Sequence, residues 1–123
     1  MQKIQSKNKV VSQAIARYVR VSPFKVRRVV REIKGLPVDK ALTTLKMLKP
    51  IYSAGLLCKV IESAQANAKH NVKFEGTLKV ENILVDQALI LKRSQPRSKG
   101  RAFPIKKRLS HIAVFLTAAT DKE

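Results

Sequence analysis

The sequence predicts an α+β domain in which a small antiparallel three-stranded sheet packs against three helices and extends into a long basic β-hairpin. Apolar residues follow the helical period between residues 22 and 71 and the two-fold strand period beyond Gly76. Between two strand-like runs, residues 91–108 contain eight Lys or Arg residues and no acidic residue. With 123 residues, the chain has the length of one domain.

The first predicted element is a short edge strand over residues 14–21, which combine Ala, Tyr and Val with two arginines. It follows a basic N-terminal lead over residues 1–10 that runs into no long apolar stretch. We therefore expect neither a secretory signal nor a membrane anchor, whereas the remnant of a processed organellar precursor stays open.

Ser22 and Pro23 predict the start of the first helix. Serine suits the N-cap, and proline at the first helical position lacks only an N–H group that would have no helical partner. Gly35 can end this helix in the left-handed conformation. The residues expected on the buried face follow the helical spacing: Val26, Val29, Val30 and Ile33.

The remaining face of this helix is basic, with Glu32 as its only acidic residue. Its cations are Lys25, Arg27, Arg28, Arg31 and Lys34. A solvated helix face usually mixes both charge signs. We therefore favour a face that contacts a polyanion, and a merely solvated face is the alternative.

Two further helices are predicted before residue 72. The second opens at Leu36 and Pro37 and ends at Pro50, and its inward residues are Val38, Ala41, Leu42, Leu45 and Leu48. The third covers residues 51–71 and is expected to be the central packing element, because small residues on one face allow close approach to a sheet. That face comprises Ala54, Leu57, Cys58, Ile61, Ala64 and Ala68.

Beyond a turn at Glu75 and Gly76, two strands are expected to form a hairpin. The first strand is expected to place three apolar residues on one face: Leu78, Val80 and Leu84. The second strand covers residues 105–116, with Ile112, Val114 and Leu116 on one face. We assign residues 84–110 to a protruding hairpin with its tip at about 92–103, and residues 118–123 to a tail.

The connection between these strands is expected to be a loop over residues 92–104 rather than more sheet. It contains Pro96, Gly100 and Pro104, which punctuate strands. Cations occupy both strands and the loop, so this distal part has no apolar face to bury against its own domain. Alone in water it would gain little from ordering, and we expect it to be mobile in the free protein.

The charge balance calls for an anionic partner. The chain has 26 Lys and Arg residues against 8 Asp and Glu residues, a formal net charge of +18 at pH 7. RNA, DNA and an acidic membrane face are the candidates. A membrane surface fits least, because the apolar residues of the first helix are Val and Ile of core type.

A basic arm that an anion surrounds on several sides favours folded RNA over a flat surface. Arg93, Arg97, Arg101 and Arg108 are the preferred contact residues, because a planar guanidinium can chelate a phosphate or stack on a base. Gly100 would let backbone approach RNA closely. A DNA-binding architectural protein that uses a basic β-arm is the alternative reading.

No constellation of catalytic or metal-ligating residues is apparent, and we expect no enzyme activity, cofactor or metal. The two histidines, His70 and His111, have no adjacent base, nucleophile and orienting group in any motif. The single cysteine, Cys58, lies on the predicted apolar face of the third helix and is interpreted as a small core residue.

Three blocks of sequence carry a resemblance to a known family. They are LKRSQPRSKGRAFPIKKRLSHIAVFL over residues 91–116, SPFKVRRVVREIKG over residues 22–35 and ESAQANAKHN over residues 62–71. In this order and at these distances they resemble the bacterial-type L-twenty-two family of large-subunit ribosomal proteins. The blocks cover nearly all of the chain that is expected to fold.

The resemblance implies a location in the large ribosomal subunit, in the bacterial cytoplasm or the plastid stroma. In that family the domain lies near the exit of the peptide tunnel, and the hairpin penetrates the large-subunit (23S-type) rRNA as an assembly clamp. The expected partners are that rRNA, neighbouring ribosomal proteins including the L-four family tunnel protein, and the nascent peptide chain.

The expected RNA-binding set has two sources. Some of its residues match the family's pattern, and the others lie on the basic faces of the domain. It comprises Arg17, Arg20, Lys25, Arg27, Arg28, Arg31, Lys34, Lys92, Arg93, Arg97, Lys99, Gly100, Arg101, Lys106, Lys107 and Arg108. The tip residues expected to line the tunnel are Arg93, Pro96, Arg97, Lys99 and Arg101. The chain departs from the family in DQALILKR, residues 86–93, which lacks the acidic-Gly-Pro turn of many bacterial members.

Overall fold

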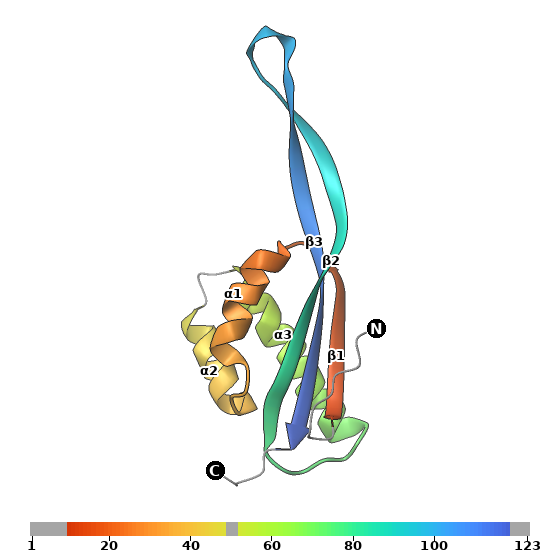
Figure 1. Ribbon diagram of the computed structural model, residues 1–123. Coiled ribbons are helices and arrows are strands. Elements are labelled where there is room, and N and C mark those ends of the chain that lie inside the picture. Colours follow the sequence, from red (N-terminus) through yellow and green to blue (C-terminus); the bar gives the residue numbers. More distant parts are fainter. Residues whose placement is uncertain (1–9, 49–51, 119–123) are drawn as a thin grey trace.

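The computed structural model describes residues 10–48 and 52–118 as three helices and three long strands (Figure 1). The strands β1 (Val10–Val19), β2 (Leu78–Pro96) and β3 (Ala102–Ala118) form one antiparallel sheet in the order β1-β3-β2. The helices are α1 (Pro23–Ile33), α2 (Val38–Met47) and α3 (Tyr52–His70), and a short 3-10 turn, Ser98–Gly100, joins β2 to β3. This arrangement confirms the predicted α+β fold class.

The edge strand β1 begins earlier than predicted. Val10 pairs with Thr117 of β3, so it belongs to the strand and not to the N-terminal lead. The strand ends at Val19, after Tyr18 takes a positive φ of 55°. The predicted lead up to residue 9, the helix boundary at Pro50 and Ile51, and the tail beyond Ala118 lie outside the described residues.

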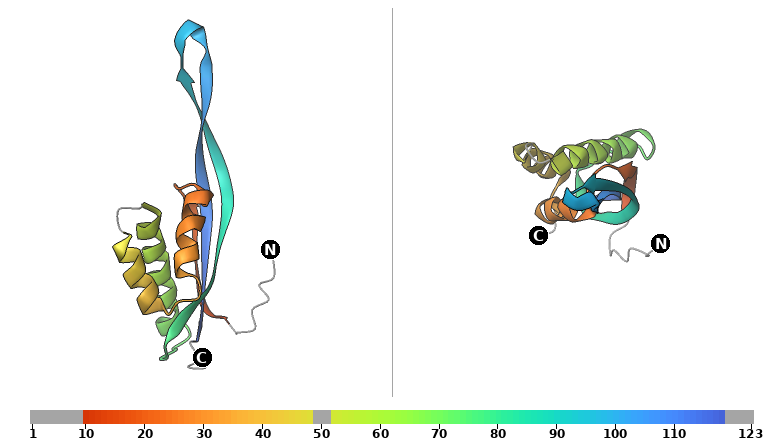
Figure 2. Two further views of the ribbon diagram at one scale, coloured as in Figure 1. Left: turned by 60° about the vertical axis from the view of Figure 1, so that its left-hand side comes forward. Right: turned by 90° about the horizontal axis from the view of Figure 1, so that it is seen from above.

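The core lies between the helices and one face of the sheet (Figure 2). The helix α3 packs on β1 and β3, α1 packs on β2, and α2 packs on α3. Large side chains from every layer are fully buried: Ile33, Leu45, Leu57, Ile61, Ile112 and Leu116. The predicted inward faces of the helices are therefore confirmed, except that Leu42, Leu48 and Cys58 are only partly buried at the margin. No helix among the described residues is long and apolar enough to cross a membrane.

The helix α3 approaches β1 closely, as its small residues predict. Ser12 of β1 donates a hydrogen bond from Oγ to the Ala64 carbonyl over 3.0 Å. Asn67 in turn donates from Nδ2 to the Gln13 carbonyl over 3.0 Å. Because Ala64 and Ala68 carry only a methyl group, these short polar contacts form without displacing the packed interface.

The two ends of α1 lie where the sequence predicts them, but one capping contact is missing. Ser22 occupies the N-cap and Pro23 the first helical position, but the Ser22 side chain makes no capping hydrogen bond. At the other end Lys34 is the C-cap, and Gly35 follows with a φ of +85°. The Gly35 N–H donates to Val80 O over 2.9 Å, and Val80 N donates to Leu36 O over 2.9 Å. The Leu36 N–H also donates back to Ile33 O over 3.2 Å, so the left-handed Gly35 ends α1 as predicted and in addition links it to β2.

Two glycine substitutions are expected to change stability in opposite directions. Gly35→Ala should destabilise the protein by about 1–2 kcal/mol, because an L side chain is strained at this positive φ although the space around it is open. Gly55→Ala, in the first turns of α3, also meets open space but keeps a helical backbone, and should stabilise by about 0.5–1 kcal/mol. Urea unfolding measures both changes. Equal effects of the two variants would contradict this reading of Gly35.

A β-bulge in β2 overturns one predicted face. Val80 pairs with Leu116 but Asn82 pairs with Phe115, so two steps along β2 oppose one step along β3. Asn82 stabilises the irregular backbone by accepting a hydrogen bond at Oδ1 from the Ile83 N–H over 2.9 Å. Ile83 and Val85 therefore point into the core, and the prediction that Leu84 shares the face of Val80 is wrong.

The strands β2 and β3 continue as a two-stranded ribbon beyond the helices (Figure 1). Their pairing runs from Ile90↔Arg108 to Pro96↔Ala102, so the predicted loop over residues 92–104 is wrong in extent. Only residues 97–101 connect the paired ends. Pro104 lies within the ladder opposite Ser94, which is tolerated because each strand of the ribbon has an unpaired edge where a missing N–H costs nothing.

Candidate nucleic-acid interface

The turn at the end of the ribbon presents three cations within five residues. Arg97 N–H donates to Arg101 O over 2.7 Å and closes the turn. Lys99 and Gly100 inside it both have positive φ, 61° and 70°. Glycine at position 100 suits this left-handed backbone, and a Cβ there would meet open space, so its role is conformational and not steric.

An aromatic contact orders one arginine of this turn. The Arg97 guanidinium lies 5.7 Å from the centroid of the Phe103 ring, which is 51% exposed. Together with Ser98 and Arg101 these two residues line a hollow of about 330 Å³. Arg93, lower on the ribbon, donates to the Lys92 carbonyl over 2.9 Å. The end of the ribbon thus combines one guanidinium group held by an aromatic contact with one exposed ring.

The predicted RNA-binding residues are exposed, apart from Arg108, which is half-buried. Among the described residues the only ion pair joins Lys79 to Glu81 over 4.0 Å, and it includes none of the predicted set. Their positive charges therefore lack neutralising carboxylates within the described chain. Such a surface attracts polyanions and releases counterions when it binds them.

Phe24 of α1 holds two of the predicted arginines against the base of the ribbon. The guanidinium groups of Arg27 and Arg108 lie 5.7 Å and 5.8 Å from its ring centroid. Arg27 also donates from Nη2 to the Val85 carbonyl of β2 over 2.8 Å. The tertiary structure thus gives Arg27 a structural contact between α1 and β2. Sequence analysis misses Phe24, although an aromatic residue at the start of a basic helix is a usable signal.

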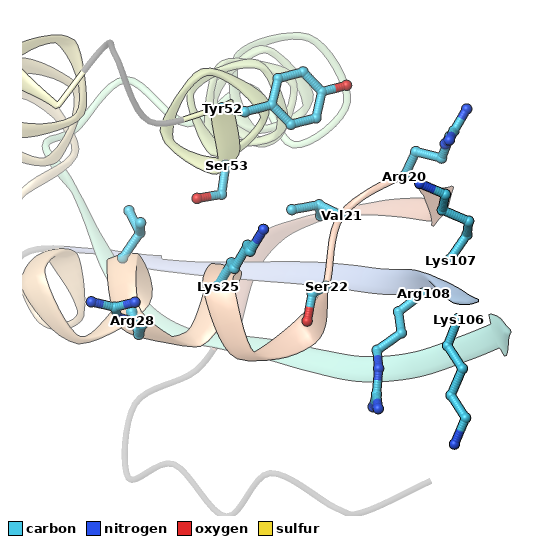
Figure 3. Close-up of a pocket in the computed structure, with 11 residues that line it drawn as sticks. Arg20, Val21, Ser22, Lys25, Arg28, Tyr52, Ser53, Lys106, Lys107 and Arg108 are labelled. Carbon is cyan, nitrogen blue, oxygen red and sulfur yellow. The ribbon is translucent and has the colours of Figure 1, made fainter. Parts of the chain in front are cut away.

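A cleft at the junction of domain and ribbon brings six of the predicted cations together (Figure 3). It has a volume of about 740 Å³ and is lined by residues from the end of the β1 segment, from α1, from the start of α3 and from β3. Its cations are Arg20, Lys25, Arg28, Lys106, Lys107 and Arg108. Tyr52 and Ser53 of α3 also line it, and sequence analysis does not single them out.

The structure separates the other predicted cations from this cleft. Arg17 lines a different hollow with Tyr18 and His111, on the face of the sheet away from the core. Arg31 and Lys34 are exposed farther along α1 and do not line the cleft. The tip residues lie at the far end of the ribbon (Figure 1). The basic surface is therefore distributed over several places.

His111 and Cys58, which sequence analysis considered as possible functional residues, make contacts that stabilise the fold. His111 Nδ1 accepts a hydrogen bond from the Tyr18 backbone N–H over 3.1 Å, and the two rings meet edge to face. Burial raises the pKa of the Cys58 thiol, and Glu62 raises that pKa further against an opposing effect of Lys46. In residues 10–48 and 52–118, no three His, Cys, Asp or Glu side chains are grouped as a metal site requires.

A small α+β domain with an exposed cationic ribbon defines a structural nucleic-acid-binding protein. Residues 14–117 match the family described as Ribosomal protein L22p/L17e, and the chain belongs to this family. Family members of this kind are structural constituents of the large ribosomal subunit and associate with its rRNA. The resemblance in the three sequence blocks is thereby confirmed.

Curated relatives match over most of their length. The chain is 48% identical over 110 residues to "Large ribosomal subunit protein uL22" of Desulfosudis oleivorans, covering 89% of this chain and 95% of the relative. It is 47% identical over 112 residues to the protein of that name from Heliobacterium modesticaldum, with 90% and 79% covered. It is 40% identical over 109 residues to "Large ribosomal subunit protein uL22c" of Chlorokybus atmophyticus, with 88% and 91% covered.

Proposed function

We propose that the chain binds and clamps the 23S-type RNA of the large ribosomal subunit during assembly, with its ribbon inserted into the folded RNA. The observation that carries this proposal is the ribbon itself. Its paired residues from Lys92 to Pro96 and from Ala102 to Lys107 are exposed except Ile105, and they contact no core. A two-stranded hairpin is marginally stable alone in water. Anionic surroundings on several sides would stabilise it.

The mode of recognition is shape and backbone reading of folded RNA. The chain has no Trp, and Phe103 is the only aromatic residue near the turn, so a stacking platform for a series of bases is missing from the ribbon. Arginine and lysine side chains along both strands instead suit phosphate contacts across a folded RNA surface. The predicted RNA-binding residues on the ribbon, from Lys92 to Arg108, are proposed to make these contacts.

We further propose that the tip residues Arg93, Pro96, Arg97, Lys99 and Arg101 line the peptide exit tunnel. Their neighbours there would be the nascent peptide chain and the L-four family protein. Family membership and the location of these residues around the turn support this proposal. The role is structural and not enzymatic, in keeping with a ribosomal protein family.

A salt series of RNA binding tests the proposed function. Binding to large-subunit rRNA, an unrelated structured RNA and a mixed DNA duplex is measured for the intact chain and for a shortened variant. In this variant an Asn-Gly turn replaces residues 96–102 and joins the paired residues Gln95 and Phe103, which keeps the rest of the ladder. The three cations removed are Arg97, Lys99 and Arg101.

We expect the intact chain to prefer rRNA. The slope of log K against log salt should become shallower by about 2 to 3 in the shortened variant, because each lost phosphate contact contributes about 0.7 to 0.9. Equal binding of all three nucleic acids, with an unchanged slope after shortening, would reject the proposal and favour the DNA-binding alternative. Circular dichroism of both proteins controls for folding.

A further inference from the structure

The cleft beside the ribbon has the composition of an anion site. Its six cations come from three separate segments, the connection between β1 and α1, helix α1 and strand β3, and no acidic residue lines it. Figure 3 shows Arg20 and Lys107 together on one side, Lys25 in the middle and Arg28 farther along α1. These cations repel one another in the free protein, and an anion bound in the cleft would relieve that repulsion.

Ser53 supplies a second, independent observation. Its side chain is buried, with 2% of the residue exposed, and Oγ has no hydrogen-bond partner among the described residues. Figure 3 shows this hydroxyl extending from α3 toward α1 at the cleft. Buried polar side chains are almost always paired, so this hydroxyl is available to a hydrogen-bond acceptor that enters the cleft.

The position of Ser53 in its helix favours a negatively charged ligand. Ser53 is the second residue of α3, which spans Tyr52–His70. The first N–H groups of a helix have no partner within it, and the helix dipole makes this end positive. The N-terminal end of this 19-residue helix shares the cleft with Lys25 and carries an unpaired hydroxyl, which together suit a phosphate.

We propose that this cleft is a phosphate-binding site for the backbone of a single RNA segment, separate from the tip of the ribbon. The inference deepens the proposed function and rests on it. One phosphate oxygen accepts a hydrogen bond from Ser53 Oγ, and Lys25 neutralises the same group. Arg20 and Lys107 on one side and Arg28 on the other bind the neighbouring phosphates. Arg108 is held over the Phe24 ring and extends away from Ser53 (Figure 3), so it lies at the margin of this site.

Inorganic triphosphate and a short single-stranded oligoribonucleotide are the probes. Amide chemical shifts of the intact protein are followed by NMR during titration with each. We expect saturable shifts at Val21, Ser22 and Ser53, which line the cleft, and smaller shifts at the Ser98–Gly100 turn. Shifts that grow equally and without saturation at both places would overturn the proposal, because they would show only general attraction to a polycation.

A matched pair of double variants separates the cleft from overall charge. Lys25→Gln with Lys107→Gln removes two lysines of the cleft. Lys40→Gln with Lys59→Gln removes two exposed lysines of α2 and α3 that do not line it. We expect the first pair to weaken triphosphate binding about tenfold or more and the second to change it less than about twofold. Equal losses in both pairs would reject the site.

Ser53→Ala gives the sharpest signature, because affinity and stability should change independently. Loss of one hydrogen bond to phosphate should weaken triphosphate binding about two- to tenfold. The melting temperature of the free protein should stay the same or rise, since the hydroxyl has no partner and alanine favours helix. A lower melting temperature with unchanged binding would show that Ser53 is structural, and the proposal would then be wrong.

Failure of this inference is distinguishable from failure of the proposed function. If the cleft is not a phosphate site, both double variants behave alike with triphosphate while the intact chain still prefers rRNA. If the proposed function is wrong, the intact chain shows no preference for rRNA in the salt series, whatever the triphosphate titration shows. The shortened ribbon should leave triphosphate shifts at Ser53 unchanged.

Discussion

Replacing Arg97 and Arg101 together by glutamine is expected to weaken binding of large-subunit rRNA by at least about tenfold, with no change in melting temperature. Both guanidinium groups sit at the turn, exposed and without a carboxylate partner in the described part of the chain. The slope of log K against log salt should fall by about 1.4 to 1.8, because two phosphate contacts are lost. Filter binding at several salt concentrations measures both quantities.

The stability of the protein should be unaffected for reasons that the structure makes explicit. The hydrogen bond that closes the turn joins backbone atoms, Arg97 N and Arg101 O, and survives either substitution. The contact between Arg97 and the Phe103 ring is solvent-exposed and local to the turn. Neither side chain reaches the core. A marked drop in melting temperature would place these residues in the folding unit and contradict this account.

Two control variants refine the same experiment. Arg97→Lys with Arg101→Lys keeps the charge but loses the planar guanidinium, so the salt slope should recover while part of the affinity loss remains. Lys40→Gln with Lys59→Gln removes the same number of charges from exposed helix positions. It should change rRNA binding far less. Equal losses for the tip and for these helix lysines would show that only net charge matters.

Leu57→Ala is expected to destabilise the domain by about 2–5 kcal/mol, because it removes a fully buried side chain and leaves a cavity. Leu57 has no exposed surface and lies on the face of α3 that packs into the core. A loss of this size is a large part of the stability of a domain of this length. Urea unfolding followed by circular dichroism measures it.

The same substitution at the base of the ribbon, just before its first pair, provides the control. Leu89 lies on β2 with 63% of its surface exposed, and Leu89→Ala should change stability by less than about 0.5 kcal/mol. The two leucines thus separate a folding core from a ribbon that contributes little to stability. A comparable loss for both variants would mean that the ribbon folds as part of the core.

Much of the fold could be predicted from local patterns. The apolar spacing of Val26, Val29, Val30 and Ile33 reflects the helical period, and these residues are all buried. Along β3, the alternate residues that form the predicted face are all buried: Ile112, Val114 and Leu116. Such patterns can be read from a short stretch of sequence, because each helix or strand must bury one face whichever element it packs against.

Where the prediction is wrong, long-range pairing has overridden a local rule. Prolines and a glycine predicted a loop over residues 92–104, but antiparallel pairing of β2 with β3 extends to Pro96↔Ala102. In β2 a bulge before Asn82 shifts the two-fold period, so that Ile83 is buried and Leu84 is not. Neither outcome is visible in one segment, because each depends on the register of the opposite strand.

The sequence by itself determined the helical and strand periods, the excess of positive charge and its concentration in residues 91–108, and the resemblance to a ribosomal protein family. These are properties of neighbouring residues along the chain. Only the tertiary structure decided which cations act together. It brings Arg20, Lys25 and Lys107 into one cleft beside the buried hydroxyl of Ser53, and it ties Arg27 to Val85. Contacts between residues far apart in sequence depend on packing and register, which no local pattern specifies.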